Sequence, residues 1–277
     1  MFHEPQWVVT LLAVTDDLSF ALRMADAADA LTMQRFGARD LAVDTKPDQT
    51  PVSDADRATE ERLREMIAAD RPRDTILGEE FGETGSADRC WILDPIDGTK
   101  SYIRGVPVWA TLIALTSRWP VLESSSIELG VVSAPALGRR WWASRGAGAW
   151  MSVNGTPSAI TASAVNQVGA ASLSFTEWKD PEWDASGLRP AFDRLLREVW
   201  RSRAYGDFWS HMMVAEGTVD AAVEPELFPW DMAALIPIVE EAGGRVTALD
   251  GSSPMVGGNA LSSNGLLHTS LLAAFRS

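Results

Sequence analysis

The stretch Trp91-Ile92-Leu93-Asp94-Pro95-Ile96-Asp97-Gly98-Thr99 decides how this chain of 277 residues is organised. Apolar residues at its start predict a buried strand, and the Pro, Gly and Thr that follow predict a loop at the end of that strand. Asp94 and Asp97 stand at this end, where two carboxylates are costly to desolvate unless a cation lies between them. Because Mg²⁺ prefers carboxylate and carbonyl oxygens, the stretch predicts part of a metal site.

Composition and charge limit the partners of the chain. The formal net charge is −14 at pH 7, and 46% of the residues are hydrophobic, which is enough for a substantial core. Nucleic acids and anionic membrane surfaces are bound by basic patches, so neither is an expected partner. Cys90 is the one cysteine, which rules out an internal disulfide and fits a reducing, cytoplasmic location.

The first 15 residues are expected to form an extension outside the fold. The apolar run over residues 8–14 has no basic segment before it and is too short to span a membrane, so it is typical neither of a signal peptide nor of an anchor. The rest is expected to form an α+β half over residues 16–150, which contains the predicted metal site, and an α/β half over residues 151–277, which binds the substrate.

Alternating strands and helices predict a layered α/β fold. Pro237 falls inside the helix predicted over residues 230–242 and is expected either to kink it or to lie where the lost hydrogen bond is tolerated. Ser53 and Asp56 have the spacing of a capping box at the start of a helix. The periodicity predicts helices over residues 16–36, 53–69, 190–197, 207–216, 230–242 and 266–275, and strands over 75–77, 108–116, 127–134, 141–143, 148–150, 172–174, 200–204, 221–223 and 245–249.

Four acidic residues stand where predicted strands end or helices begin. Each of them alone also fits a helix cap or a surface charge. Together, in a chain with three histidines, they predict an all-oxygen Mg²⁺ site in preference to a zinc site. These residues are Glu79, Asp94, Asp97 and Asp231.

The order and spacing of four motifs resemble the inositol-monophosphatase-like metal-dependent phosphatases. The motifs are Gly78-Glu79-Glu80, the stretch from Asp94 to Thr99, Trp230-Asp231 and Glu241-Ala242-Gly243-Gly244. The resemblance runs from about Asp17 to the C-terminus. It implies an αβαβα sandwich of the inositol-monophosphatase and fructose-bisphosphatase type, and a phosphate-monoester hydrolase.

The same resemblance implies roles for individual residues. Two or three Mg²⁺ ions would be held by Glu79, Asp94, Asp97 and Asp231 and by the carbonyl of Ile96. Thr99 and Glu79 would orient a water on the metal, and Asp54 would accept a hydrogen bond from the Thr99 hydroxyl. Lys46 falls near a lysine of the family's mobile loop. Substrate contacts would come from Glu79, Asp97, Gly98, Thr99, Lys100, Arg203, Asp207, Glu224 and Asp231, with the backbone N–H groups of Gly98 and Thr99 on the phosphate.

Asp207 points to the class of substrate. A second carboxylate beside Glu224 suits a cationic amine or an imidazole, and histidinol phosphate, a phosphorylated amino alcohol, has both. Two plainer interpretations stay open, because Asp207 also fits the cap of the helix that follows and Arg203 also fits an exposed ion pair. His211 is expected to be a structural residue of that helix.

The sequence also resembles the histidinol-phosphatase branch of this family, in stretches such as Arg35-Phe36-Gly37 and Thr45-Lys46-Pro47-Asp48. We therefore expect hydrolysis of L-histidinol phosphate to L-histidinol and phosphate in histidine biosynthesis, by a homodimer. An inositol-1-monophosphatase or a broad-specificity phosphatase is the alternative within the family. A 3′-nucleotide phosphatase would need an adenine pocket that no motif indicates, and a non-catalytic paralogue is disfavoured because Asp54, Thr99 and the expected metal ligands are present.

Overall fold

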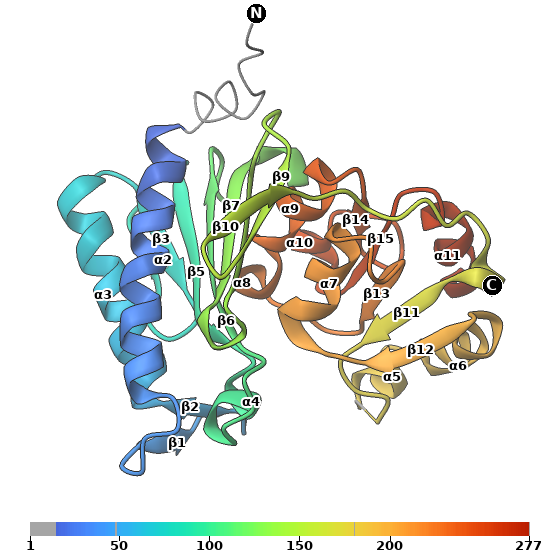
Figure 1. Ribbon diagram of the computed structural model, residues 1–277, viewed down its shortest axis with the longest axis horizontal. Coiled ribbons are helices and arrows are strands. Elements are labelled where there is room, and N and C mark those ends of the chain that lie inside the picture. The colour runs from blue at the N-terminus through green and yellow to red at the C-terminus, as the bar shows by residue number, and fades with distance from the viewer. Residues whose placement is uncertain (1–14, 48, 180, 277) are drawn as a thin grey trace, which may run out of the picture.

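The computed structural model describes residues 15–47, 49–179 and 181–276, and it contains two large sheets between layers of helices (Figure 1). The predicted extension lies outside these residues except for Thr15, whose hydroxyl accepts a hydrogen bond from Leu18 N and caps the first described helix. The helices are α2 (Asp16–Arg35), α3 (Asp54–Asp70), α4 (Thr99–Ile103), α5 (Glu182–Ala185), α6 (Arg189–Glu198), α7 (Asp207–Ala215), α8 (Pro229–Met232), α9 (Leu235–Glu241), α10 (Pro254–Gly257) and α11 (His268–Phe275).

The first sheet has eight strands in the order β10-β9-β8-β7-β6-β5-β3-β4. All its neighbouring strands are antiparallel except β3 and β5, which are parallel. Its strands are β3 (Thr75–Gly78), β4 (Gly82–Thr84), β5 (Cys90–Asp97), β6 (Ala110–Thr116), β7 (Ile127–Ala134), β8 (Arg139–Ser144), β9 (Ala149–Val153) and β10 (Thr156–Ala159).

The second sheet has five strands in the order β12-β11-β13-β15-β14, with β11 parallel to both of its neighbours. A separate hairpin joins β1 (Val43–Thr45) to β2 (Pro51–Ser53). The strands of the second sheet are β11 (Ser172–Phe175), β12 (Arg201–Ala204), β13 (Ala221–Glu224), β14 (Arg245–Thr247) and β15 (Ala260–Ser263).

The helices and the two sheets form five layers, and three apolar cores lie between them, the central one on both sides of the middle helix layer (Figure 1). This arrangement confirms the predicted αβαβα sandwich. On β5, Trp91 and Leu93 face the core under α2 and α3, whereas Cys90 and Ile92 face the central core. This alternation follows from the period of two of a strand. The central core packs α7 and α9 between the two sheets, and the third core packs α6 and α11 on the far side of the second sheet.

The halves are closely joined. The predicted boundary between residues 150 and 151 lies within β9, and the first sheet continues through β10. Helix α9 of the second half packs against β7 and β8 of the first sheet. The division into domains stays a prediction. No helix among the described residues is long and apolar enough to cross a membrane.

The prediction of one helix over residues 230–242 is wrong, because the structure has α8 and α9 with a break at Ala233 and Ala234. Pro237 has no N–H to donate to the carbonyl of Ala233, four residues earlier. The break also fits Gly130 on β7, since a Cβ there would lie 2.1 Å from the carbonyl oxygen of Ala234. The absence of a side chain at Gly130 therefore lets β7 pack closely against the break between α8 and α9.

Candidate active site

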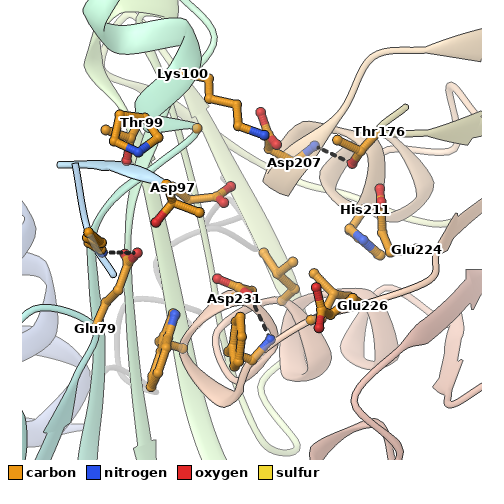
Figure 2. Close-up of a pocket in the computed structure, with 18 residues that line it drawn as sticks. Glu79, Asp97, Thr99, Lys100, Thr176, Asp207, His211, Glu224, Glu226 and Asp231 are labelled. Atoms are coloured by element: carbon orange, nitrogen blue, oxygen red, sulfur yellow. Dashed lines mark hydrogen bonds and ion pairs between the residues drawn. The ribbon is translucent and has the colours of Figure 1, made fainter. Parts of the chain in front are cut away.

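A cavity of about 460 Å³ lies where β5 ends and α4 begins, with α8 beside the end of β5, and α7 and β13 form the opposite wall (Figure 2). Residues from both halves of the chain line it. Those predicted for the site are Lys46, Glu79, Asp97, Gly98, Thr99, Lys100, Asp207, Glu224 and Asp231.

A β-bulge at the end of β5 brings two acidic residues together. In a regular strand, Asp94 and Asp97 would point to opposite faces because they are three residues apart. Here Asp94 pairs with Leu112 and Asp97 with Ala110, so β5 has one residue more than β6 between the two pairs. The extra residue re-aims the side chains, and oxygen atoms of Asp94, Asp97 and Asp231 all lie within 4.8 Å of one another.

Burial and mutual repulsion disfavour the charged forms of these three carboxylates. Burial raises the pKa of Asp94 and Asp97 well above the usual range, and neighbouring carboxylates raise both further. Burial also raises the pKa of Asp231 to about 7, although its carboxylate accepts a hydrogen bond from Phe228 N at 2.7 Å. Asp94 Oδ1 is buried and has no hydrogen-bond partner among the described residues. The cluster therefore fits a divalent cation, which would pair with the charges and with this oxygen.

Lys46 joins a fourth acidic residue to the site. The ammonium of Lys46, in the turn between β1 and β2, lies 2.7 Å from Glu79 Oε1 and 2.7 Å from Glu80 Oε1. Burial disfavours the charged lysine, but these hydrogen bonds outweigh burial and raise the pKa of Lys46. Burial raises the pKa of Glu80 to about 7. Glu79 thus lies at the edge of the cluster and is paired with a cation of the chain itself.

Gly98 and Thr99 form the start of α4. Gly98 has a φ of +85°, and a Cβ there would lie 3.0 Å from the carbonyl oxygen of Val108, so the turn requires glycine. The Thr99 hydroxyl lies 3.0 Å from the carbonyl of Ile96 and 3.2 Å from Asp56 Oδ1. The Ile96 carbonyl, an expected metal ligand, is thereby turned toward Thr99.

The prediction that Asp54 bonds the Thr99 hydroxyl is wrong, because Asp56 makes this contact. Asp56 is fully buried, and it also accepts hydrogen bonds from Ser53 N and Ser53 Oγ in the predicted capping box, which is confirmed. Asp54 points elsewhere and pairs with Arg35 at 2.7 Å.

The opposite wall begins at α7. The N-cap of α7 is Gly206, with no side-chain hydrogen bond, so the structure does not use the Asp207 carboxylate as a helix cap. Instead this carboxylate lies against Gly98, and Figure 2 shows the Lys100 side chain extending toward it. Burial raises the pKa of Asp207 to about 6, and the charge of Lys100 opposes this. Phe208 N donates a hydrogen bond to Asp97 Oδ2 at 2.7 Å and so ties this wall to the carboxylate cluster.

Of the two predicted substrate contacts Glu224 and Arg203, only Glu224 lines the cavity. Glu224, at the end of β13, is buried and lines the cavity as predicted. Arg203 is exposed on β12, the edge strand of the second sheet, and it does not line the cavity. Its guanidinium donates to the carbonyl of Ser202. The prediction that Arg203 contacts substrate therefore finds no support within the described chain, because this side chain is exposed and lies outside the cavity lining.

Several residues of the cavity were not predicted from the sequence. Thr176 accepts a hydrogen bond from Asp207 N at 3.1 Å, and Phe228 stacks on Trp230 with ring centroids 5.2 Å apart. His211 was expected to be structural, yet it lines the cavity. Its position four residues after Asp207 was a usable signal, because such residues share one face of a helix. Glu226 and Leu227 also line the cavity, and they follow β13 without any periodic signal.

Known proteins are similar to this chain in sequence and in fold. A histidinol-phosphatase of Mycobacterium tuberculosis is 55% identical over 259 residues, which are 93% of this chain and 96% of that protein. A histidinol-phosphatase of Streptomyces coelicolor is 53% identical over 260 residues, again 93% and 96% of the two chains. The solved structure of the extragenic suppressor protein suhB from Bartonella henselae superposes with a TM-score of 0.84 at 27% identity, covering 95% of this chain and 99% of that one.

The family assignment rests on nearly the whole chain. The model of the inositol monophosphatase family matches residues 14–277, and this range contains all four sequence motifs. The bulged strand and the carboxylate cluster lie within the matched range. The chain therefore belongs to the inositol monophosphatase family, which confirms the resemblance seen in its sequence.

Proposed function

We propose that this chain is a Mg²⁺-dependent phosphate-monoester hydrolase that converts L-histidinol phosphate and water to L-histidinol and phosphate in histidine biosynthesis. The names of its relatives at 53% and 55% identity support the substrate. The observation that carries the proposal is the cavity itself, which has a carboxylate cluster on one side and further carboxylates on the other. A phosphate with its metal ions fits the first side, and a cationic amine or imidazole fits the second.

The metal would be held by Asp94, Asp97 and Asp231, together with Glu79 and the carbonyl of Ile96. Two or three bound Mg²⁺ ions would neutralise the phosphate, lower the pKa of a water and stabilise the leaving alkoxide. Glu79, which is paired with the Lys46 ammonium, would have to exchange this partner for the metal to take this role. The start of α4 is suited to a phosphate oxygen, because the first N–H groups of a helix have no partner within it.

Thr99, together with Glu79, is the residue that we assign to orienting the attacking water. Its hydroxyl is placed between Asp56 Oδ1 and the Ile96 carbonyl, so its position is fixed by the cap of α3 and by the bulged end of β5. Asp56 acts through Thr99 as a positioning residue. The protein then contributes mainly by holding the reacting groups in line.

The far side of the cavity distinguishes the amino alcohol from an inositol. Asp207, Glu224 and Glu226 supply acceptors and negative charge that an ammonium or imidazole group can pair with. An inositol ring is neutral apart from its phosphate and gains less from these charges. The acidic net charge further supports a small-molecule substrate over nucleic acid or a membrane. We also propose a cytoplasmic homodimer, supported by the single cysteine and by the tryptophan-rich strands of the first half.

Phosphate release with Mg²⁺ from L-histidinol phosphate, inositol 1-phosphate and a 3′-nucleotide tests the proposal. We expect kcat/KM for histidinol phosphate to exceed the others by at least a hundredfold. Asp207→Asn should lower this preference at least tenfold, because it removes a buried charge from the amine-binding side. Asp88→Asn, in an exposed loop, is the matched control and should leave the preference unchanged. Equal rates on inositol 1-phosphate and histidinol phosphate would overturn the substrate assignment.

A further inference from the structure

His211 is a buried residue on the wall of the cavity that faces the carboxylate cluster. It belongs to α7, is 1% exposed and lines the cavity together with Thr176 and Glu224 (Figure 2). Its Nδ1 lies 2.7 Å from Ser262 Oγ on β15. Because the two ring nitrogens lie on different edges of the imidazole, this contact anchors one edge to the second sheet and leaves Nε2 directed away from it.

The Nε2 atom of His211 is an exception among the buried polar atoms of the protein. It finds no hydrogen-bond partner within residues 15–47, 49–179 and 181–276. Buried polar side chains in folded proteins usually have one, so each exception needs a physical reason. The other described buried histidine, His268, satisfies both ring nitrogens, with Ser263 Oγ at 2.8 Å and Thr247 Oγ1 at 2.9 Å.

The surroundings of His211 indicate what the missing partner is. Burial lowers the pKa of His211 to about 4, so at neutral pH the ring is uncharged and keeps one acceptor nitrogen. The neighbouring groups on this wall include the carboxylates of Asp207, Glu224 and Glu226, which are acceptors. A ligand that completes such a wall must carry hydrogen-bond donors, and the N–H groups of an ammonium or imidazole supply these together with a positive charge that suits the carboxylates.

We infer that His211 is a substrate-binding residue, whose Nε2 accepts a hydrogen bond from an N–H of the amino alcohol at the end away from the phosphate. This role places the ring proton on Nδ1, from which it is donated to Ser262 Oγ, and leaves Nε2 as the acceptor for the ligand. This inference rests on the proposed function, because it assigns a contact to the amine or imidazole end of that substrate.

Two substitutions separate binding from a structural role. In His211→Asn the amide reaches the position of Nδ1 and keeps the contact with Ser262 but removes the ε atom, whereas in His211→Gln the amide oxygen or nitrogen lies near the former Nε2. We expect His211→Asn to raise KM for histidinol phosphate about tenfold or more, with a smaller change in kcat, and to lower the preference over inositol 1-phosphate by a similar factor. His211→Gln should recover a substantial part of this loss. His268→Asn, which keeps the contact with Ser263 but loses the buried hydrogen bond between Nε2 and Thr247 away from the cavity, should lower the unfolding temperature but leave the preference unchanged.

The outcomes are distinct. If the unmodified enzyme hydrolyses histidinol phosphate with the expected preference and His211→Asn keeps its KM, the inference about His211 is wrong and the proposed function stands. If His211→Asn lowers the unfolding temperature as His268→Asn does and weakens both substrates equally, His211 is structural and the inference is again wrong. If the unmodified enzyme shows no preference for histidinol phosphate, the proposed function fails first.

Discussion

Exchanging Asp56 for Asn isolates the hydrogen bond that joins the first turn of α3 to Thr99. The two bonds from Ser53 reach Oδ2, whereas the bond from Thr99 reaches Oδ1. An asparagine has one acceptor oxygen, which satisfies more donors on the Ser53 side, so the amide NH₂ faces Thr99. The Thr99 hydroxyl then accepts from this amide and must donate to the Ile96 carbonyl, so the variant replaces a hydrogen bond to a charged acceptor with a neutral bond of opposite direction. Loss of the bond to the charged group is worth up to about 1.5–3 kcal/mol, and if this acts fully in the transition state kcat falls by up to roughly 10- to 150-fold.

The assay compares kcat of Asp56→Asn and Asp54→Asn at saturating histidinol phosphate and Mg²⁺. Asp54→Asn makes the same change two residues earlier in α3, where the carboxylate pairs with Arg35 and not with Thr99. We expect it to keep kcat within about twofold, since pairs at the surface contribute little. Thermal unfolding controls for the weakened cap of Asp56→Asn, which should cost about 1 kcal/mol or a few degrees in Tm. An equal fall in kcat for both variants would refute the assignment of Asp56 as the partner of Thr99.

Two further predictions concern stability. Burial raises the pKa of Glu80 and Asp231 to about 7, above their ordinary values, so in the metal-free protein their contribution to stability is complete below about pH 4 and is lost as the pH rises through 7. Added Mg²⁺ should raise the Tm of the protein at pH 8, and Asp94→Asn should abolish most of this rise. A Tm that does not change when Mg²⁺ is added would contradict the metal site. Gly130→Ala should destabilise the protein by about 1–3 kcal/mol in urea unfolding, because the new Cβ meets the carbonyl of Ala234, whereas Gly169→Ala, with its nearest contact at 3.8 Å, should not.

Much of the fold was predictable because its main elements carry strong local signals. The strand expected over residues 127–134 matches β7, and the helices expected from residues 16 and 53 match α2 and α3 to within one or two residues. The short edge strands escaped detection. β1 and β10 have three and four residues that are all exposed, so no alternation of apolar and polar side chains marks them.

The site was predictable in composition but not in every contact. Asp54 and Asp56 are both acidic residues in the first turn of α3, and the resemblance led to the choice of Asp54, which is the wrong one of the two. Side chains two residues apart on a helix differ by about 200° in direction, so only one of the two can face Thr99. The spacing of the capping box marked Asp56 as the inward residue, and the structure shows that the cap and the contact with Thr99 belong to the same carboxylate.

The hydrogen bond from Phe208 N to Asp97 has a consequence for how enzymes of this architecture can diverge. The donor is a main-chain amide, which every residue except proline possesses. Side chains at the start of α7 are therefore free to change without breaking the link to the carboxylate cluster. A new substrate preference can arise there by single substitutions while the reacting groups keep their places, so the recognition end of the cavity can evolve faster than its chemical end.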